Sequence, residues 1–303
     1  MITSNIYNRA FWNAVRGKTE DSVDLREGLF EDGSYVMPLE FRQKFASALE
    51  KDNLFRKHAS LVSINLPDFN IEAVASTGMA GWTREGEAYP ESSDRFVSMR
   101  LNPCKLAALS RIKNAFIKDT RFDLTGYIAD EFARRFGRTE ENAFINGNGE
   151  TQPSGILHEM EGAQMGVTAA SETAITFDEV TALYFALKPE FRRNAIWIMN
   201  DNTAFHLRKL KDESGASLWN HNTDTIFGKP VEISPFMPDM AAGAKPIVLA
   251  DLRYYWVVER QPLSVKILTE LYALQGQTGL QAYEMLDGRL VMPEAAQVLR
   301  MAT

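Results

Sequence analysis

Cysteine and histidine are scarce in this 303-residue chain. Cys104 is the only cysteine, which excludes an intrachain disulfide and a cysteine-rich metal site and fits a reducing compartment. The four histidines, His58, His158, His206 and His221, are scattered, and none falls in a spacing typical of metal ligands. We therefore expect no metal and no cofactor.

Long apolar runs, secretory signals and basic tracts are also lacking. No apolar run reaches the length of a membrane span, and the N-terminus has neither the cationic start nor the apolar block of a signal sequence. Folding in the cytoplasm, without a membrane, is the resulting expectation. The formal net charge is -7, and no run of lysine and arginine is interleaved with aromatics, so sequence-specific binding of nucleic acid is not expected. A protein that encloses nucleic acid without binding it tightly is compatible with this net charge.

Motifs for catalysis and nucleotide binding are absent as well. The chain has no GxxxxGK[ST] phosphate loop, and Gly147-Asn148-Gly149 lacks the third glycine and the preceding strand of a dinucleotide site. Ser154 does not lie in a GxSxG setting. No catalytic and no cofactor-binding residue is predicted, and the chain is not expected to be an enzyme.

A long helix dominates what is present. Four large apolar residues recur at every fourth position: Leu124, Ile128, Phe132 and Phe136. Asp130 and Glu131 each lie four residues before an arginine, Arg134 and Arg135, a spacing that supports a solvated helix face. An Asn-Gly-Asn-Gly sequence then stops the pattern. The spacing predicts a helix from Leu124 to Asn146, about 34 Å long at 1.5 Å per residue.

Residues 65–113 are predicted to form a long hairpin. Val97, Met99 and Leu101 alternate with polar residues, the period of a strand with one buried face. The centre of this segment is rich in residues that break regular structure, namely Gly78, Gly81, Gly86 and Pro90. Such a tip cannot pack a core of its own, so it should be an exposed loop that needs a partner.

A second packed unit is predicted from residue 175 onward, as the chain length suggests about two units. Thr176 and Glu179 have the spacing of a capping box, with Ile175 and Val180 positioned to pack outside it. Strands at 195–199, 231–233, 247–250 and 254–258, with a helix at 202–211, indicate a sheet flanked by helices. The dipeptide Asp287-Gly288 predicts a hairpin between 280–286 and 289–292. The final strand, 297–301, is expected to return to the first unit and cover the long helix.

The order of several motifs resembles one family of proteins. The chain contains, in sequence, GSYVMPLEF, WTREGEAYPESSDRF, AFINGNG, QPSGIL, TFDEVTALYFAL and IVLADLRYYWVVER. With a tryptophan and glycines at the loop tip, this order resembles the major capsid proteins of tailed bacteriophages. The resemblance covers nearly the whole chain and implies the α+β fold of phage Hong Kong 97.

The resemblance also implies a division of the chain into the segments of that fold. These are an N-terminal arm at 1–32, peripheral-domain segments at 33–64, 112–175 and 269–303, an extended loop at 65–111, and an axial domain at 176–268. The arm should lie along this subunit or a neighbour. Family members often begin with a scaffolding region that is cut away, and little precedes the short helix expected at 8–16, so we expect a separate scaffolding protein or a mature form.

A self-assembling structural protein is the function that the resemblance implies. Its copies would form the pentamers and hexamers of an icosahedral phage head that encloses double-stranded DNA, built in the host cytoplasm. A scaffolding protein, a portal, and a protease or decoration proteins are the further partners implied. An encapsulin, which is a compartment shell of the same fold, and a soluble α/β enzyme with an unrecognised site are the alternatives.

Candidate inter-subunit contacts follow from the loop and the long helix: Trp82, Arg84, Glu85, Glu87, Tyr89, Arg134 and Arg135. Glu85 and Glu87 are expected to meet Arg134 and Arg135 of a neighbouring copy.

Overall fold

The computed structural model describes residues 5–18, 24–64, 70–76, 82–84, 95–119, 121–211, 215 and 217–303. The chain divides into two compact units, which confirms the expectation from its length. Unit 1 comprises Met1–Asn65, Pro103–Gly155 and Val257–Gly288, and unit 2 comprises Leu66–Asn102, Ile156–Trp256 and Arg289–Thr303. Each unit therefore combines stretches that are distant in sequence.

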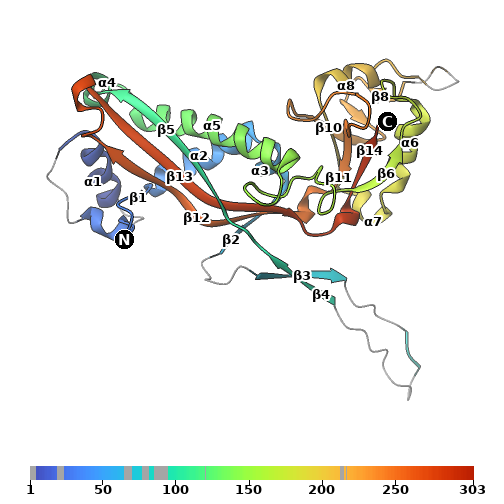
Figure 1. Ribbon diagram of the computed structural model, residues 1–303, viewed down its shortest axis with the longest axis horizontal. Coiled ribbons are helices and arrows are strands. Elements are labelled where there is room, and N and C mark those ends of the chain that lie inside the picture. The colour runs from blue at the N-terminus through green and yellow to red at the C-terminus, as the bar shows by residue number, and fades with distance from the viewer. Residues whose placement is uncertain are drawn as a thin grey trace. The chain divides into compact units, whose positions relative to one another are not determined.

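Unit 1 is a five-stranded sheet covered by helices (Figure 1). Its helices are α1 (Asn5–Val15), α2 (Leu39–Asp52), α3 (Leu54–His58), α4 (Asn114–Lys118) and α5 (Leu124–Asn146), with 3-10 turns at Asp24–Gly28 and Ala273–Gln275. Its strands are β1 (Tyr35–Val36), β2 (Ser60–Ser63), β5 (Cys104–Lys113) and most of β12 (Tyr255–Leu268) and β13 (Gln277–Leu290). The strand order is β1-β12-β13-β5, with β2 also paired to β12.

The long helix α5 has the predicted bounds, Leu124–Asn146. Asp123 caps it, because its side chain accepts a hydrogen bond from the backbone N–H of Gly126 at 3.0 Å. Its apolar stripe is buried against α2 and the sheet. At Gly137 an added Cβ would lie 3.3 Å from Leu49 Cδ2, so glycine permits the close approach of α2 and α5.

The described part of the N-terminal arm packs on its own subunit. Tyr7, Phe11, Trp12 and Val15 of α1 are buried in the core of unit 1. Tyr7 Oη also donates a hydrogen bond to the backbone oxygen of Val36 at 2.5 Å.

Unit 2 is built on a seven-stranded sheet in the order β6-β14-β11-β7-β10-β9-β8. Its strands are β6 (Gln164–Thr168), β7 (Ile196–Met199), β8 (Trp219–Asn220), β9 (Thr225–Ile226), β10 (Lys229–Ile233), β11 (Ile247–Ala250) and β14 (Ala296–Arg300). Its helices are α6 (Phe177–Ala186), α7 (Pro189–Arg192) and α8 (Asp201–Leu207), with 3-10 turns at Leu252–Tyr254 and Pro293–Ala295. The predicted capping box is present at the start of α6.

The last strand departs from the sequence-based expectation. β14 is not a strand of the unit 1 sheet; it pairs with β6 and β11 in the sheet of unit 2. Its residues from Ala296 to Leu299 are buried at four consecutive positions. A strand that covered a helix on one face only would alternate between buried and exposed positions, whereas consecutive burial is typical of an interior strand. Residues 289–303 therefore belong to unit 2.

The predicted hairpin at Asp287-Gly288 is wrong, because β13 continues through this dipeptide to Leu290. A tight Asp-Gly turn needs a positive φ at both central residues, and neither has one. Asp287 is buried, its side chain accepts from the backbone N–H of Gly288 at 2.8 Å, and the Gly288 oxygen accepts from Ser154 N–H at 2.8 Å. These bonds hold the dipeptide in an extended strand.

The boundary expected at residue 268 also differs. β12 is one continuous strand to Leu268 and pairs with β13 and β1, so residues 257–288 belong to unit 1.

Candidate assembly surface

The hairpin β3 (Asn70–Ser76) and β4 (Arg95–Arg100) forms a two-stranded antiparallel sheet of its own. Its register runs from Asn70 opposite Arg100 to Val74 opposite Phe96. Within the part of the chain that the structure describes, these two strands pair only with each other. Because an isolated two-stranded ribbon is marginally stable in water, this ribbon is an incomplete structure.

Two of the five loop residues singled out from the sequence lie in the described part of the loop. Trp82 is fully exposed, at 106% of its reference area, and Arg84 is exposed beside it. Glu85, Glu87 and Tyr89 lie outside the described residues.

The solvent face of α5 carries an arginine pair that shares one carboxylate. Glu131 forms ion pairs with both Arg134 and Arg135, so Arg134 pairs three residues back and not with Asp130 as its spacing suggested. Arg135 also donates from Nη1 to the backbone oxygen of Leu109 on β5 at 3.1 Å. The side chain of Arg134 is 63% exposed and that of Glu131 13%. Two cations against one carboxylate leave this face able to accept a further acidic group.

An exposed aromatic patch on unit 2 was not found from the sequence. It consists of Tyr184, Phe185, Phe227 and Arg192, with the Arg192 guanidinium carbon 5.3 Å and 5.2 Å from the ring centroids of Tyr184 and Phe185. Phe185 is 63% exposed. Apolar surface of this kind on a soluble domain commonly marks an interaction site. The signal in the sequence, a Tyr-Phe pair in α6, is equally compatible with core packing.

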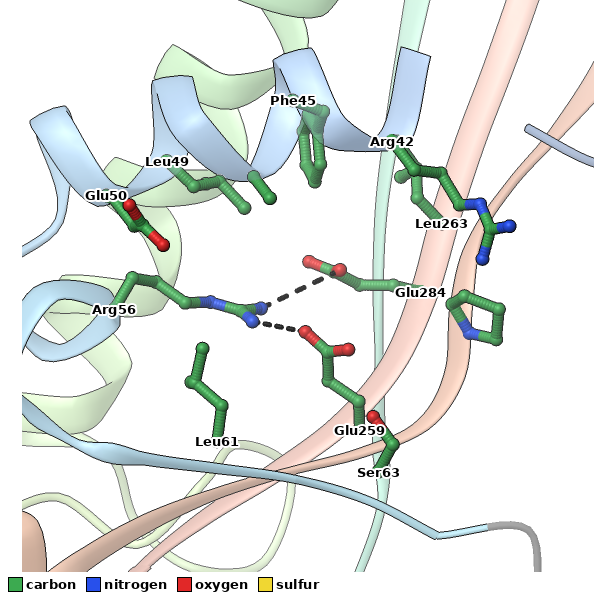
Figure 2. Close-up of a pocket in the computed structure, with 12 residues that line it drawn as sticks. Arg42, Phe45, Leu49, Glu50, Arg56, Leu61, Ser63, Glu259, Leu263 and Glu284 are labelled. Carbon is green, nitrogen blue, oxygen red and sulfur yellow. Dashed lines mark hydrogen bonds and ion pairs between the residues drawn. The ribbon is translucent and has the colours of Figure 1, made fainter. Parts of the chain in front are cut away.

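A buried ion cluster joins four elements of unit 1, and Figure 2 shows part of it. Asn53 caps α3 by accepting from the backbone N–H of Arg56 at 3.1 Å. The Arg56 guanidinium donates from Nε and Nη2 to both carboxylate oxygens of Glu140 on α5, at 2.8 and 2.7 Å, and from Nη1 to Glu259 on β12. Glu284 Oε2 on β13 lies 3.8 Å from Nη2. One cation therefore ties α3 and α5 to two strands.

Three carboxylates around one guanidinium cannot all be equally stabilised. Burial opposes ionisation of Glu140, but the charge and hydrogen bonds of Arg56 outweigh it and hold the pKa of Glu140 below its usual value. Burial, and then the negative charge of Glu140, raise the pKa of Glu284 well above its usual value. Of these two carboxyl groups, Glu284 therefore keeps its proton to the higher pH. Sequence periodicity gives no sign of these residues, because the contacts of Arg56 with Glu140, Glu259 and Glu284 span 84, 203 and 228 positions.

Metal-ligating groups and the single cysteine are the remaining candidates for a chemical site. The described residues contain no group of three or more histidine, cysteine, aspartate or glutamate side chains placed to hold a metal ion. Burial, and then Asp287, raise the pKa of the Cys104 thiol, which disfavours the reactive thiolate. None of the described helices is both long and apolar enough to cross a bilayer.

Comparisons with known proteins agree on one family. The sequence model of the phage capsid family matches residues 33–301. The chain is 26% identical over 197 residues to the capsid polyprotein of Pseudomonas phage PAJU2, a match that covers 60% of this chain and 28% of that protein. The chain thus spans little more than a quarter of that relative's length.

Solved structures with the same fold extend this result. The capsid of an empty GTA particle computed with C5 symmetry has a TM-score of 0.70 and 27% identity, over 83% of this chain and 90% of that chain. A chain from Microbacterium phage Oxtober96 has a TM-score of 0.57 at 16% identity, over 82% of this chain and 91% of that chain. The second likeness shows the fold alone. Because the family model covers most of the sequence and the α+β fold is that of Hong Kong 97 type capsids, this chain belongs to the phage capsid family and is a structural major capsid protein.

Proposed function

We propose that copies of this chain assemble into the pentamers and hexamers of an icosahedral head that encloses double-stranded DNA. Assembly would take place in the host cytoplasm with a scaffolding protein, a portal, and a protease or decoration proteins. In this proposal unit 1 is the peripheral domain, unit 2 the axial domain, and the β3–β4 ribbon the extended loop. The C5 symmetry named for the capsid of the empty GTA particle supports closed rings for this chain too.

Two observations carry the proposal together: the β3–β4 ribbon pairs with no other strand among the described residues, and the indole of Trp82 in the loop between its strands is exposed. Burying a tryptophan side chain removes about 150 to 250 Å² from water. At about 25 cal/mol per Å², this is worth roughly 4 to 6 kcal/mol before ordering costs. A second copy that covers Trp82 and adds to the ribbon would supply this free energy, whereas an isolated subunit cannot.

The loop can be tested by deletion. Replacing residues 78–96 with a short glycine-serine linker should leave a folded, soluble subunit, because the side chains described in this segment, those of residues 82–84, are exposed. Electron microscopy of the unaltered chain should show closed shells, and the deletion variant should show none. Normal closed shells from the deletion variant would remove the loop from assembly.

Charge reversal tests the proposed contact between the loop and α5. Glu87→Lys should impair shell formation, and adding Arg134→Glu should partly restore it. Exposed pairs are weak, about 0 to 1 kcal/mol each, but the contact would repeat at every subunit. Glu172→Lys, on an exposed residue of unit 2, is the matched control. Absence of rescue would mean that these two residues are not partners.

The contents of the particles separate a phage head from a compartment shell. Nuclease-treated particles from infected cultures should release double-stranded DNA on heating. Particles that hold only protein cargo would contradict the proposal.

A further inference from the structure

A cavity of about 300 Å³ lies in unit 1 beside the ion cluster (Figure 2). Its walls come from α2, α3, β2, β12 and β13 and include Phe45, Leu49, Leu61 and Leu263. Leu61 is 49% exposed, so the cavity opens to the surface next to β2. Its volume is at the lower end of the range of small-molecule sites.

The charged groups around this cavity are mainly negative. Glu50 from α2, Glu259 from β12 and Glu284 from β13 line it, together with Arg56 from α3 and Arg42 from α2. Glu140 from α5 does not line the cavity but accepts two hydrogen bonds from Arg56, and Glu259 accepts a third. Four carboxyl groups thus face two guanidinium groups.

One buried acceptor at this cavity lacks a hydrogen-bond partner. Glu284 is only 3% exposed, and its Oε1 has no hydrogen-bond partner among the residues that the structure describes. Figure 2 shows its side chain reaching between Arg56 and Arg42. No ion pair joins Arg42 to Glu284 among the described residues. Arg56 Nη2 lies 3.8 Å from the other carboxyl oxygen of Glu284, Oε2, while its hydrogen bonds go to Glu140 and Glu259. An unpaired buried acceptor costs about 1 to 3 kcal/mol, so a native occupant is expected to supply a donor.

We propose that this cavity binds an alkylammonium group, with Glu284 as the carboxylate that receives the charge. The apolar walls fit a methylene stem, and the carboxyl groups fit a cationic head, which is the division found in a lysine side chain or a small polyamine. Glu259, at the partly exposed side of the cluster, contributes negative charge near the entrance. Binding requires Glu284 to give up its proton, since only the carboxylate pairs with an ammonium group.

The inference goes beyond shell assembly and does not rest on it, because binding can be measured on the unassembled full-length chain. Titration calorimetry with 1-aminobutane and 1,4-diaminobutane should detect binding, whereas 1-butanol, which has the stem without the charge, should not bind. In two buffers of different ionisation enthalpy, the heats should report the release of about one proton per site. Affinity should rise about tenfold per pH unit while Glu284 is protonated in the empty site.

Two variants test whether binding depends on the Glu284 carboxylate and on access to the cavity. Glu284→Gln retains the shape of the side chain and should weaken binding at least tenfold and abolish proton release. Ala46 is exposed and lines the cavity, so Ala46→Phe should obstruct the entrance without altering the core and weaken binding similarly. Ser47→Phe, on the adjacent exposed residue that does not line the cavity, is the matched control and should leave affinity within about twofold.

Failure of both amines to bind the unaltered chain would show that the cavity holds water only and would overturn the proposal. Binding of equal affinity in Glu284→Gln would overturn it as well. Both binding measurements use the unassembled chain, so they do not depend on whether the loop-deletion variant forms shells.

Assembled particles identify the source of the ammonium group. A carbodiimide cross-link between Glu284 and a lysine of another copy would identify the neighbouring subunit. Amines in acid extracts of particles, without such a cross-link, would identify a free polyamine. Particles with neither occupant would contradict the proposal.

Discussion

Arg56 is the residue on which unit 1 depends most. It is 6% exposed and binds Glu140 in a bidentate pair, with Glu259 and Glu284 alongside. Its removal leaves buried carboxylates without a counter-charge, which typically costs 3 to 5 kcal/mol. Arg56→Ala should therefore lower the free energy of unfolding by about 3 to 5 kcal/mol, as measured by urea denaturation of the unassembled chain.

A matched control uses an arginine whose ion pair is exposed. Arg134→Ala also breaks a contact with a glutamate, but this arginine is 63% exposed. The loss expected there is about 0 to 1 kcal/mol. If Arg56→Ala and Arg134→Ala lost the same free energy of unfolding, burial of the Arg56 ion pair would not be the reason for its larger contribution to stability.

Glu284 should make stability fall as pH rises. Its pKa is raised well above the usual value in the folded chain, by burial and then by Glu140. The folded state then holds a proton that the unfolded state releases above the ordinary glutamate pKa. This stabilisation is fully present below the unfolded pKa and is lost as pH rises toward the folded pKa. Residue 284 cannot titrate in Glu284→Gln, so this variant lacks that pH dependence. The free energy of unfolding of the variant minus that of the unaltered chain should therefore increase from pH 5 to pH 8. A constant difference across that range would mean that Glu284 is ionised in the folded protein.

The exposed residues Arg134 and Arg135 could be predicted from the sequence, whereas the buried ion cluster around Arg56 could not. The exposure of Arg134 and Arg135 follows from helical periodicity, since both lie opposite the apolar stripe. The sequence does not show that both arginines pair with Glu131. Spacings of three and four residues both allow an ion pair on a helix, and the side-chain rotamers decide which one forms. Arg56 and Glu284 meet only after the chain has folded, so no local pattern identifies them.

At the scale of elements, local signals predicted local structure. Helix α5 has its predicted bounds because a long stripe, an aspartate cap and a glycine stop all agree. The Asp-Gly signal failed because tertiary hydrogen bonds to Ser154 and burial of Asp287 override turn preference. The placement of β14 failed for a related reason, since strand order is decided by long-range pairing.

The cap of α6 gives a prediction at this scale. Thr176 accepts from Glu179 N–H at 3.3 Å, and Glu179 accepts from Thr176 N–H at 2.8 Å. Thr176→Ala should lower the unfolding free energy by about 1 kcal/mol, because the backbone N–H of Glu179 in the first turn of the helix loses its acceptor. Thr181→Ala in the same helix removes only a bond to the Phe177 oxygen and should change stability by less than about 0.5 kcal/mol. Similar losses in both variants, measured by thermal and urea unfolding, would argue against the cap.

At the scale of the whole molecule, cohesion between copies should be non-covalent. The resemblance to the Hong Kong 97 family implies one covalent alternative, an isopeptide link from a loop lysine to an asparagine of a neighbouring copy with help from a glutamate. Here the basic residues between Met79 and Phe96 are Arg84 and Arg95, which are poor nucleophiles, and no asparagine occurs from Thr223 to Thr303. Particles boiled in detergent should run as a single band near 34.1 kDa. A ladder of multimers would reveal a different donor and acceptor pair.

The interior position of β14 has a consequence for the order of synthesis. Strands β6, β7 and β11 leave the ribosome well before residues 296–300, yet β14 separates β6 from β11 in the finished sheet. A nascent chain therefore holds β6 as a single strand and, apart from it, a partial sheet of β11, β7, β10, β9 and β8, and the edges that β14 will join stay open until that strand is made. Domains usually fold as units during translation. Unit 2 can close only after its final strand has been translated, so incomplete chains are kept from presenting a finished unit 2 to a growing shell.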